Sequence, residues 1–115
     1  MAVVKIVPAY IPLGGNVKMP ALSAITSATD GAAVPFKDQD TKVAIFVENS
    51  GSGAAEVTFK KGDKGIADLV VSVPAGETHL FTVESGLYKM TSGENKGHVQ
   101  VVGPTSVKVG AVVLP

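Results

Sequence analysis

The chain contains no cysteine, no tryptophan and no arginine, and only 5% of its residues are aromatic. The lack of cysteine excludes disulfide bonds, zinc sites built from thiolates and cysteine nucleophiles. All ten basic residues are lysines, and ten acidic residues balance them to a formal net charge of zero. Nucleic-acid-binding domains usually carry a basic stripe, often with arginine to contact phosphates and guanines, so we expect no nucleic-acid partner.

Long apolar runs are also missing from the sequence. No stretch approaches the roughly 20 apolar residues that cross a membrane as a helix. In the N-terminal segment MAVVKIVPAYIPLGG, Lys5 interrupts the apolar residues and Pro8 and Pro12 follow closely, unlike the continuous apolar region of a secretory signal. We therefore expect a soluble protein that is made in the cytoplasm and has no membrane partner.

The length of 115 residues fits one domain, which divides into two parts of different character. Residues 1–42 hold one predicted short strand, VVKIV at 3–7, followed by prolines and glycines that prevent a long regular element. Residues 21–36 mix small polar and apolar side chains, and residues 37–42 (KDQDTK) are charged. The pattern predicts an extended N-terminal arm and a structured loop over residues 1–42.

Residues 43–115 read as short strands separated by turn residues. Apolar and polar residues alternate in segments that begin near 43, 55, 68, 79, 87, 98 and 106. This spacing, together with one dry and one wet face per strand, predicts an all-β, antiparallel β-sandwich of seven to eight strands, either jelly-roll or immunoglobulin-like. The predicted core consists of Val43, Ile45, Val47, Val57, Phe59, Leu69, Val71, Val73, Phe81, Val83, Val99, Val101, Val107, Val109 and Val113.

Catalytic patterns are weak throughout the chain. Ser52 lies in a glycine-rich turn without the strand-to-helix context of a nucleophile elbow. The glycine pairs are not followed by a helix, as a phosphate-binding loop requires. His79 and His98 have no partner at metal-ligand spacing, so we interpret them as surface or sheet-edge residues. We expect no enzyme, no catalytic residue and no cofactor.

Two pairs of aspartates are the candidates for a calcium site. Asp38 and Asp40 lie two residues apart, and alternate loop residues can point at one ion. Asp63 and Asp68 flank a glycine-containing loop and form the second candidate pair. The full twelve-residue calcium loop, with its central glycine and closing glutamate, is missing. We therefore interpret all four as solvated loop carboxylates and predict no metal site.

Exposed aromatic rings would indicate a sugar-binding surface. With the other aromatic residues assigned to the packed interior, Tyr10, Phe36 and Tyr88 remain as candidate platforms. A sandwich of this kind would recognise a sugar or a cell-surface ligand through loops such as 61–67 and 91–97.

Four features of residues 30–115 occur in an order that resembles a known group of proteins. They are the turn Asn49–Gly51, the strand Val57–Phe59, the strand and turn Ala67–Thr78 (ADLVVSVPAGET), and a valine-rich closing strand. In this order they resemble small β-rich proteins encoded among the head and structural genes of tailed bacteriophages. The resemblance extends over residues 30–115 of the chain.

This resemblance implies a non-enzymatic virion structural protein, a capsid decoration (cement) protein. Its partner would be the major capsid protein or another virion protein, its location the capsid surface after synthesis in the host cytoplasm, and a homo-oligomer is compatible with it. Two alternatives remain open: a minor head–tail or tail structural subunit, and a β-sandwich module that binds carbohydrate or a cell surface.

The N-terminal twenty residues contain more apolar side chains than a free tail would carry. The candidate interaction residues among them are Val4, Ile6, Tyr10, Ile11 and Leu13. Two interpretations stay open. The segment is an arm that orders on a neighbouring subunit, or it is the first strand of the sandwich's own sheet.

Overall fold

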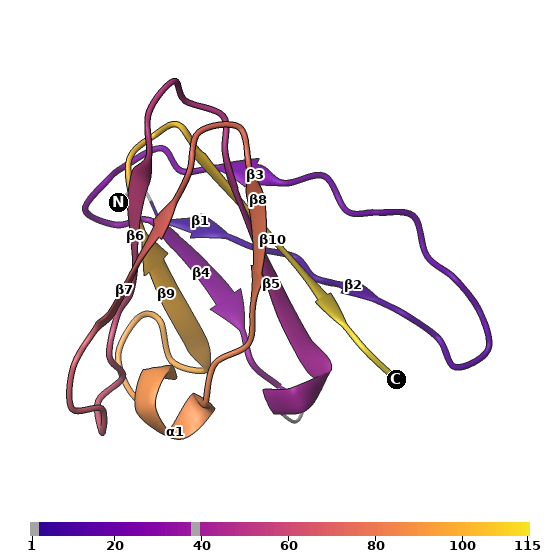
Figure 1. Cartoon of the computed structure of the whole chain (residues 1–115). Helices are drawn as coiled ribbons and strands as arrows, with labels where there is room; N and C mark the ends of the chain where they lie inside the picture. The colour runs from indigo at the N-terminus through magenta and orange to yellow at the C-terminus, as the bar shows by residue number, and fades with distance from the viewer. Residues whose placement is uncertain (1–2, 38–39) are drawn as a thin grey trace.

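Two five-stranded sheets pack face to face in the computed structural model, which describes residues 3–37 and 40–115 (Figure 1). Sheet A has the order β1 (Val4–Lys5), β4 (Ala32–Pro35), β9 (His98–Val102), β6 (Ala55–Phe59) and β7 (Leu69–Val73). Sheet B has the order β2 (Ala9–Tyr10), β10 (Val107–Val113), β5 (Val43–Asn49) and β8 (Thr78–Phe81), with β3 (Ser23–Ala24) also paired to β10. A 3₁₀ turn, η1 (Asp40–Lys42), and a one-turn helix, α1 (Ser85–Tyr88), complete the elements of the described residues.

The alternating sequence pattern builds the interior between the two sheets. Along β5, Val43, Ile45 and Val47 are buried, and the residues between them face outward and are partly exposed. A strand places successive side chains on opposite faces, so this period of two selects the inner face. All but three of the predicted core residues are buried, and the exceptions, Leu69, Val71 and Phe81, are half-buried and pack against the core.

The connectivity carries the chain back and forth between the two sheets. After β4 in sheet A the chain crosses to β5 in sheet B, returns to β6 and β7, crosses to β8, returns to β9 and ends in β10. Eight strands, β4-β9-β6-β7 facing β3-β10-β5-β8, pair in antiparallel fashion throughout. The predicted β-sandwich is therefore confirmed.

The N-terminal segment departs from the predicted pattern. β1 runs parallel to β4, and β2 runs parallel to β10, so the expectation of wholly antiparallel sheets is wrong at these two edges. Neither pair is a hairpin of sequence neighbours, so no tight turn fixes an antiparallel direction. The described residues form ten strands instead of seven to eight, and four of them, instead of one, lie within residues 1–42.

The strand predicted at residues 87–90 is also wrong. Leu87 and Tyr88 belong to α1, and only Lys89 makes an isolated bridge to the sheet, with Val99. The Asp40 carboxylate accepts a hydrogen bond from the Ser85 backbone N–H at 2.9 Å, at the first turn of α1. This contact comes from a residue 45 positions away in the sequence, so local propensity could not show it.

Among the described residues, Asn49 is the polar residue that is fully buried in the interior. Its Nδ2 group donates hydrogen bonds to the backbone carbonyls of Gly53 at 2.8 Å and Val73 at 2.9 Å. Its Oδ1 atom accepts one from the Gly51 backbone N–H at 3.0 Å. One side chain thus joins the end of β5, the turn that follows it and the end of β7. Buried polar groups are tolerated when they are satisfied in this way.

We predict that Asn49→Ala lowers the free energy of unfolding by about 2–4 kcal/mol, because the buried Val73 carbonyl and the part-buried Gly53 carbonyl lose their donor and a cavity forms. Urea denaturation followed by circular dichroism measures the change. Asn16→Ala, at an exposed loop position, is the matched control and should alter stability by less than about 0.5 kcal/mol. A loss below about 1 kcal/mol for Asn49→Ala would contradict this role.

Candidate functional site

The segment between β2 and β3 projects from the sandwich as a loop (Figure 1). Its tip is a tight turn, in which the Gly15 backbone N–H donates to the Pro12 carbonyl at 3.1 Å and Gly14 has φ of +74°. A positive φ at the third position of a turn favours glycine there. Leu13 therefore occupies the second position of the turn, and its side chain is 89% exposed.

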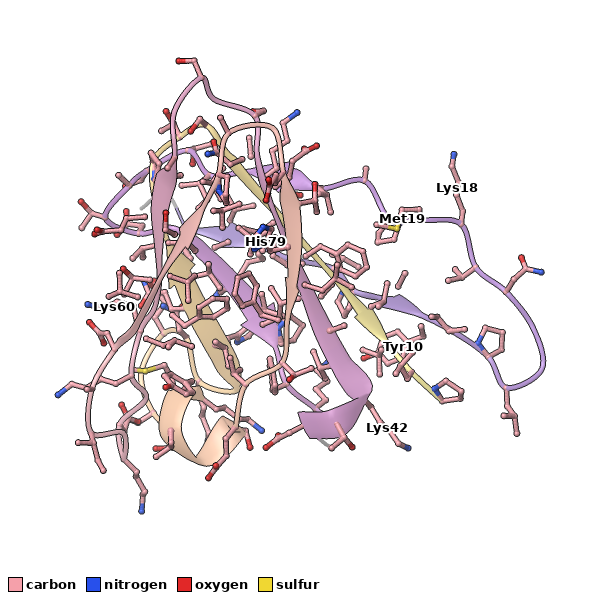
Figure 2. The ribbon with its side chains drawn as sticks, in the orientation of Figure 1. Tyr10, Lys18, Met19, Lys42, Lys60 and His79 are labelled. Carbon is pink, nitrogen blue, oxygen red and sulfur yellow. The ribbon has the colours of Figure 1, made fainter. Side chains whose placement is uncertain are left out.

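Several exposed apolar side chains gather on this loop and on the strand end beside it. We call them the loop surface; they are Tyr10, Leu13, Val17, Met19 and Leu114. Leu114 joins the group because the Ile11 backbone N–H donates to the Val113 carbonyl at 2.9 Å, which places the C-terminal strand end next to the start of the loop. Figure 2 shows Tyr10 and Met19 on the same side of the molecule, with Lys18 pointing away from the sandwich.

The returning limb of the loop is anchored on sheet B. Leu22 lies against Gly110 of β10 so closely that a Cβ atom on Gly110 would collide with the Leu22 side chain. The Ile25 backbone N–H then donates to the Val107 carbonyl at 3.0 Å, as the chain leaves β3. Both ends of the loop are fixed, and its apolar tip is left in solvent.

The outer faces of both sheets mix polar and apolar residues. On sheet B, one row runs Gly110, Phe46 and Leu80, and another runs Lys108, Glu48 and Thr78. On sheet A, one row runs Val102, Thr58 and Val70. Among the described residues, the largest group of exposed large apolar side chains is therefore not on either sheet face but on the loop surface. Concentrated exposed apolar surface marks a site of protein interaction more often than scattered residues do.

The predicted interaction residues separate into two groups. Tyr10 and Leu13 are exposed in the loop surface, and Ile11 is half-buried beside it. Ile6 instead is buried in the protein's own core, and Val4 is half-buried and packs against it. Residues 4–6 therefore match the interpretation in which the N-terminal segment is a strand of the protein's own sheet. The loop after β2 matches the interpretation in which the segment projects toward a second molecule.

Sequence reasoning missed Val17, Met19 and Leu114 as members of the loop surface. The available signal was the pair of apolar residues that flank Lys18 between Gly15 and Pro20, in a segment unable to form a regular element. Leu114 follows the last strand directly and carried no comparable signal.

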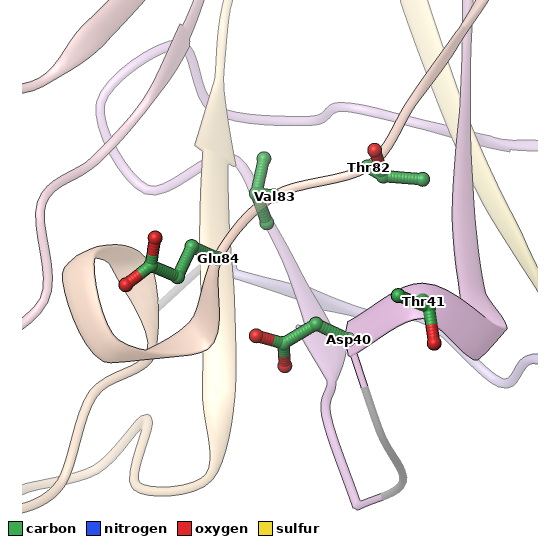
Figure 3. Close-up of a pocket in the computed structure, with 5 residues that line it drawn as sticks. All are labelled: Asp40, Thr41, Thr82, Val83 and Glu84. Carbon is green, nitrogen blue, oxygen red and sulfur yellow. The ribbon is translucent and has the colours of Figure 1, made fainter.

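A shallow depression near η1 and α1 is the second candidate site (Figure 3). It has a volume of about 410 Å³ and is lined by Asp40, Thr41, Thr82, Val83 and Glu84. The Asp40 carboxylate already accepts the Ser85 backbone N–H described above. Across residues 3–37 and 40–115, no three His, Asp or Glu side chains come together as a metal-binding group. Asp38, the predicted companion of Asp40, lies outside the described residues.

Asp63 connects the two loops that sequence reasoning singled out for ligand recognition. Its Oδ2 atom accepts hydrogen bonds from the Thr91 hydroxyl at 2.7 Å, the Thr91 backbone N–H at 2.9 Å and the Ser92 hydroxyl at 3.0 Å. These donors, first the Thr91 hydroxyl, lower the pKa of the Asp63 carboxyl because they stabilise its charged form. The loops 61–67 and 91–97 are therefore held side by side by a carboxylate that is already engaged.

Asp68 has a separate set of partners. It accepts the Lys61 backbone N–H at 2.8 Å and forms an ion pair with the Lys60 ammonium at 3.2 Å. The Lys61 N–H first, and then Lys60, lower the pKa of the Asp68 carboxyl. Asp63 and Asp68 thus accept hydrogen bonds from different backbone segments, at Thr91 and Lys61 respectively.

The aromatic and histidine candidates take different positions. Phe36 is fully buried in the core, so its prediction as an exposed platform is wrong; the alternation of β4 continues through it into the interior. Tyr88 is half-buried and packs against the core, and Tyr10 alone of the three is largely exposed. His79 lies on the edge strand β8 with its Nε2 atom 2.8 Å from a Glu77 carboxylate oxygen, and His98 Nδ1 lies 3.0 Å from the Lys96 carbonyl.

Comparison with known proteins gives no relative: no family model, no curated protein and no solved structure matches the chain. Within the part of the chain that the structure describes, no helix is long and apolar enough to cross a membrane.

We predict that Asp63→Asn reduces the pH dependence of stability. A lowered folded pKa contributes stability that is present above the ordinary value of 3.8 and is lost as the pH falls through the lowered value. The difference in unfolding free energy between the wild type and Asp63→Asn should therefore shrink as the pH falls from about 5 to about 2. Urea denaturation at a series of pH values measures it.

Thr91→Val is the companion variant, because it removes one donor and keeps the carboxylate. The unfolding free energy of Thr91→Val should still fall as the pH is lowered, but by less than that of the wild type. The fall should be larger than in Asp63→Asn, which has no carboxylate at this position. A difference between wild type and Asp63→Asn that stays constant over this range would contradict the assignment.

Proposed function

We propose that this chain is a non-enzymatic virion structural protein, a capsid decoration protein that binds the head surface of a tailed bacteriophage. The observation that carries the proposal is the loop surface: a projecting, anchored loop whose tip exposes Leu13 fully to solvent. The resemblance of residues 30–115 to structural proteins of such phages supplies the identity of the partner, a major capsid protein or another virion protein.

The physical argument starts from the energy of apolar exposure. Burying a leucine or methionine side chain from water contributes about 1.5–3 kcal/mol. The loop surface offers several such side chains on a loop whose two ends are fixed, so little conformational entropy is lost when it docks. A protein that binds many copies of one lattice subunit needs only a modest contact of this kind at each position.

We also propose which type of β-sandwich the chain forms. The order β3-β10-β5-β8 facing β4-β9-β6-β7, with the chain crossing between sheets at most connections, supports a jelly-roll description. Viral capsid proteins use this architecture, and so do lectins. We therefore favour the jelly-roll description over the immunoglobulin-like one.

The carbohydrate-binding alternative has less support from the described residues. The loops 61–67 and 91–97 contain no aromatic residue, and the Asp63 carboxylate between them is engaged by three donors. The loop surface fits a protein partner better, because Tyr10 is its one aromatic ring and its other four side chains offer neither the stacking face nor the hydrogen bonds that sugars require. A head–tail or tail subunit would use the same surface with a different virion partner.

We predict that Leu13→Ser weakens binding to capsids roughly 10-fold or more, through loss of the buried leucine. The measurement is co-sedimentation of the full chain with capsids assembled from the major capsid protein encoded beside its gene. Truncation of the N-terminal segment would be a poor test, because β1 and β2 belong to the sandwich.

Ile66→Ser is the matched control, since Ile66 is 87% exposed but lies in the loop 61–67, outside the loop surface. It should bind as the wild type does. Wild-type protein that fails to bind either capsids or tails would overturn the virion proposal. Equal binding by both serine variants and the wild type would overturn the assignment of the surface.

A further inference from the structure

The strand β8 leaves one edge of sheet B open. It pairs with β5 from Thr78 to Phe81, and within the described residues no strand pairs with its other side. In Figure 1, β8 descends across the front of the molecule from the same turn as β7, the open edge of sheet A. Proteins that avoid association usually protect such an edge with a charge, a proline, a bulge or a very short strand. β8 (THLF) is short, with four residues, but it carries no lysine, acidic residue or proline.

The hydrogen bonds to β5 show which backbone groups of this segment are free. The Asn49 backbone N–H donates to the Glu77 carbonyl at 3.0 Å, so Glu77 faces β5. Successive residues of an antiparallel strand alternate in direction, so His79 and Phe81 also face β5. The N–H and C=O groups of Thr78 and Leu80 therefore point outward, toward the open side.

The side chains of this edge are complementary to themselves. An antiparallel pairing of two β8 strands centred on Leu80 places Leu80 opposite Leu80 of the second copy. It places His79 opposite Phe81 of the second copy, so no like charges face each other within the strand. The row Gly110, Phe46 and Leu80 on the outer face then continues into the same row of the second copy.

We infer that β8 is a self-association edge, through which two copies of this chain join their B sheets around a twofold axis. Leu80, 62% exposed in the single chain, is the central apolar contact. A four-residue edge buries less than the roughly 800 Å² per partner of a standard stable interface. We therefore expect weak, reversible dimers with a dissociation constant of roughly 0.1–1 mM. The inference does not rest on the proposed function, because β8 carries no residue of the loop surface.

The open edge of sheet A provides a matched control. Val70 of β7 is 53% exposed and, like Leu80, belongs to an uncharged edge strand. Its neighbour in the sheet is Thr58, where Leu80 has Phe46. Thr58 separates Val70 from Val102, so the row that a second copy would extend at β7 is interrupted by a polar residue. Leu80→Lys and Val70→Lys thus place the same charge on the two edges.

Sedimentation velocity of the full chain from about 10 µM to about 1 mM tests the inference. The wild type and Val70→Lys should rise from the monomer mass of 11.7 kDa toward twice that value. Leu80→Lys should remain monomeric over the whole range. Wild-type protein that stays monomeric at about 1 mM, equal association by Leu80→Lys, or assembly beyond the dimer would each overturn it.

Amide hydrogen exchange on the wild type gives a readout that does not depend on the variants folding. Between about 10 µM and about 1 mM protein, the exchange rate of the Leu80 amide should fall in proportion to the fraction of protein that remains monomeric. Exchange at the His79 and Phe81 amides, which already face β5, should not change. Uniform slowing along β8, or no slowing at Leu80, would contradict the twofold pairing.

Discussion

The seven-residue pairing of β5 with β10 is the constraint on which the rest of the structure depends. Its register, from Val43 opposite Val113 to Asn49 opposite Val107, directs every second side chain of both strands into the interior. A shift by one residue would expose the valines and bury Glu48 and Lys108. The same register places Gly110 beside Phe46 on the outer face, where Leu22 anchors the projecting loop. The same strand pairing therefore orients the core side chains and anchors the loop that we propose as an interaction surface.

The two edges of each sheet differ. At one edge the N-terminal segment adds β1 to sheet A and β2 to sheet B, and these short parallel strands cover β4 and β10. At the opposite edges, β7 and β8 have no second neighbouring strand within the described residues. The half-buried Leu69, Val71 and Phe81 all belong to these two strands, whereas Val73 at the end of β7 is fully buried. The partly exposed members of the predicted core therefore lie on strands with one neighbour, although such a strand can also hold a buried residue.

Much of the fold could be predicted because alternation reports the inner face directly. The strands from residue 43 onward follow this period, and the structure places most of them within one or two residues of the predicted starts. The N-terminal strands could not be found this way, since β1 and β2 are two residues long and their partners are distant in sequence. The site shows the same limit. Ile6 and Leu13 are equally apolar, but pairing with Ala33 draws Ile6 inward and a glycine turn points Leu13 out.

The structure explains the identity of Gly31 and Asn49, but it does not explain the identity of Leu13. Gly31 has φ of +64°, and a Cβ atom there would collide with the Val101 carbonyl, so the backbone itself selects glycine. Asn49 is selected by the carbonyls that it satisfies. Leu13 has no such reason, because the second position of its turn accepts most side chains, and a polar one would be better solvated. The stability of the sandwich leaves Leu13, Val17 and Met19 unexplained. The proposed docking of the loop surface on a virion partner would account for their apolar character, because it would cover these side chains.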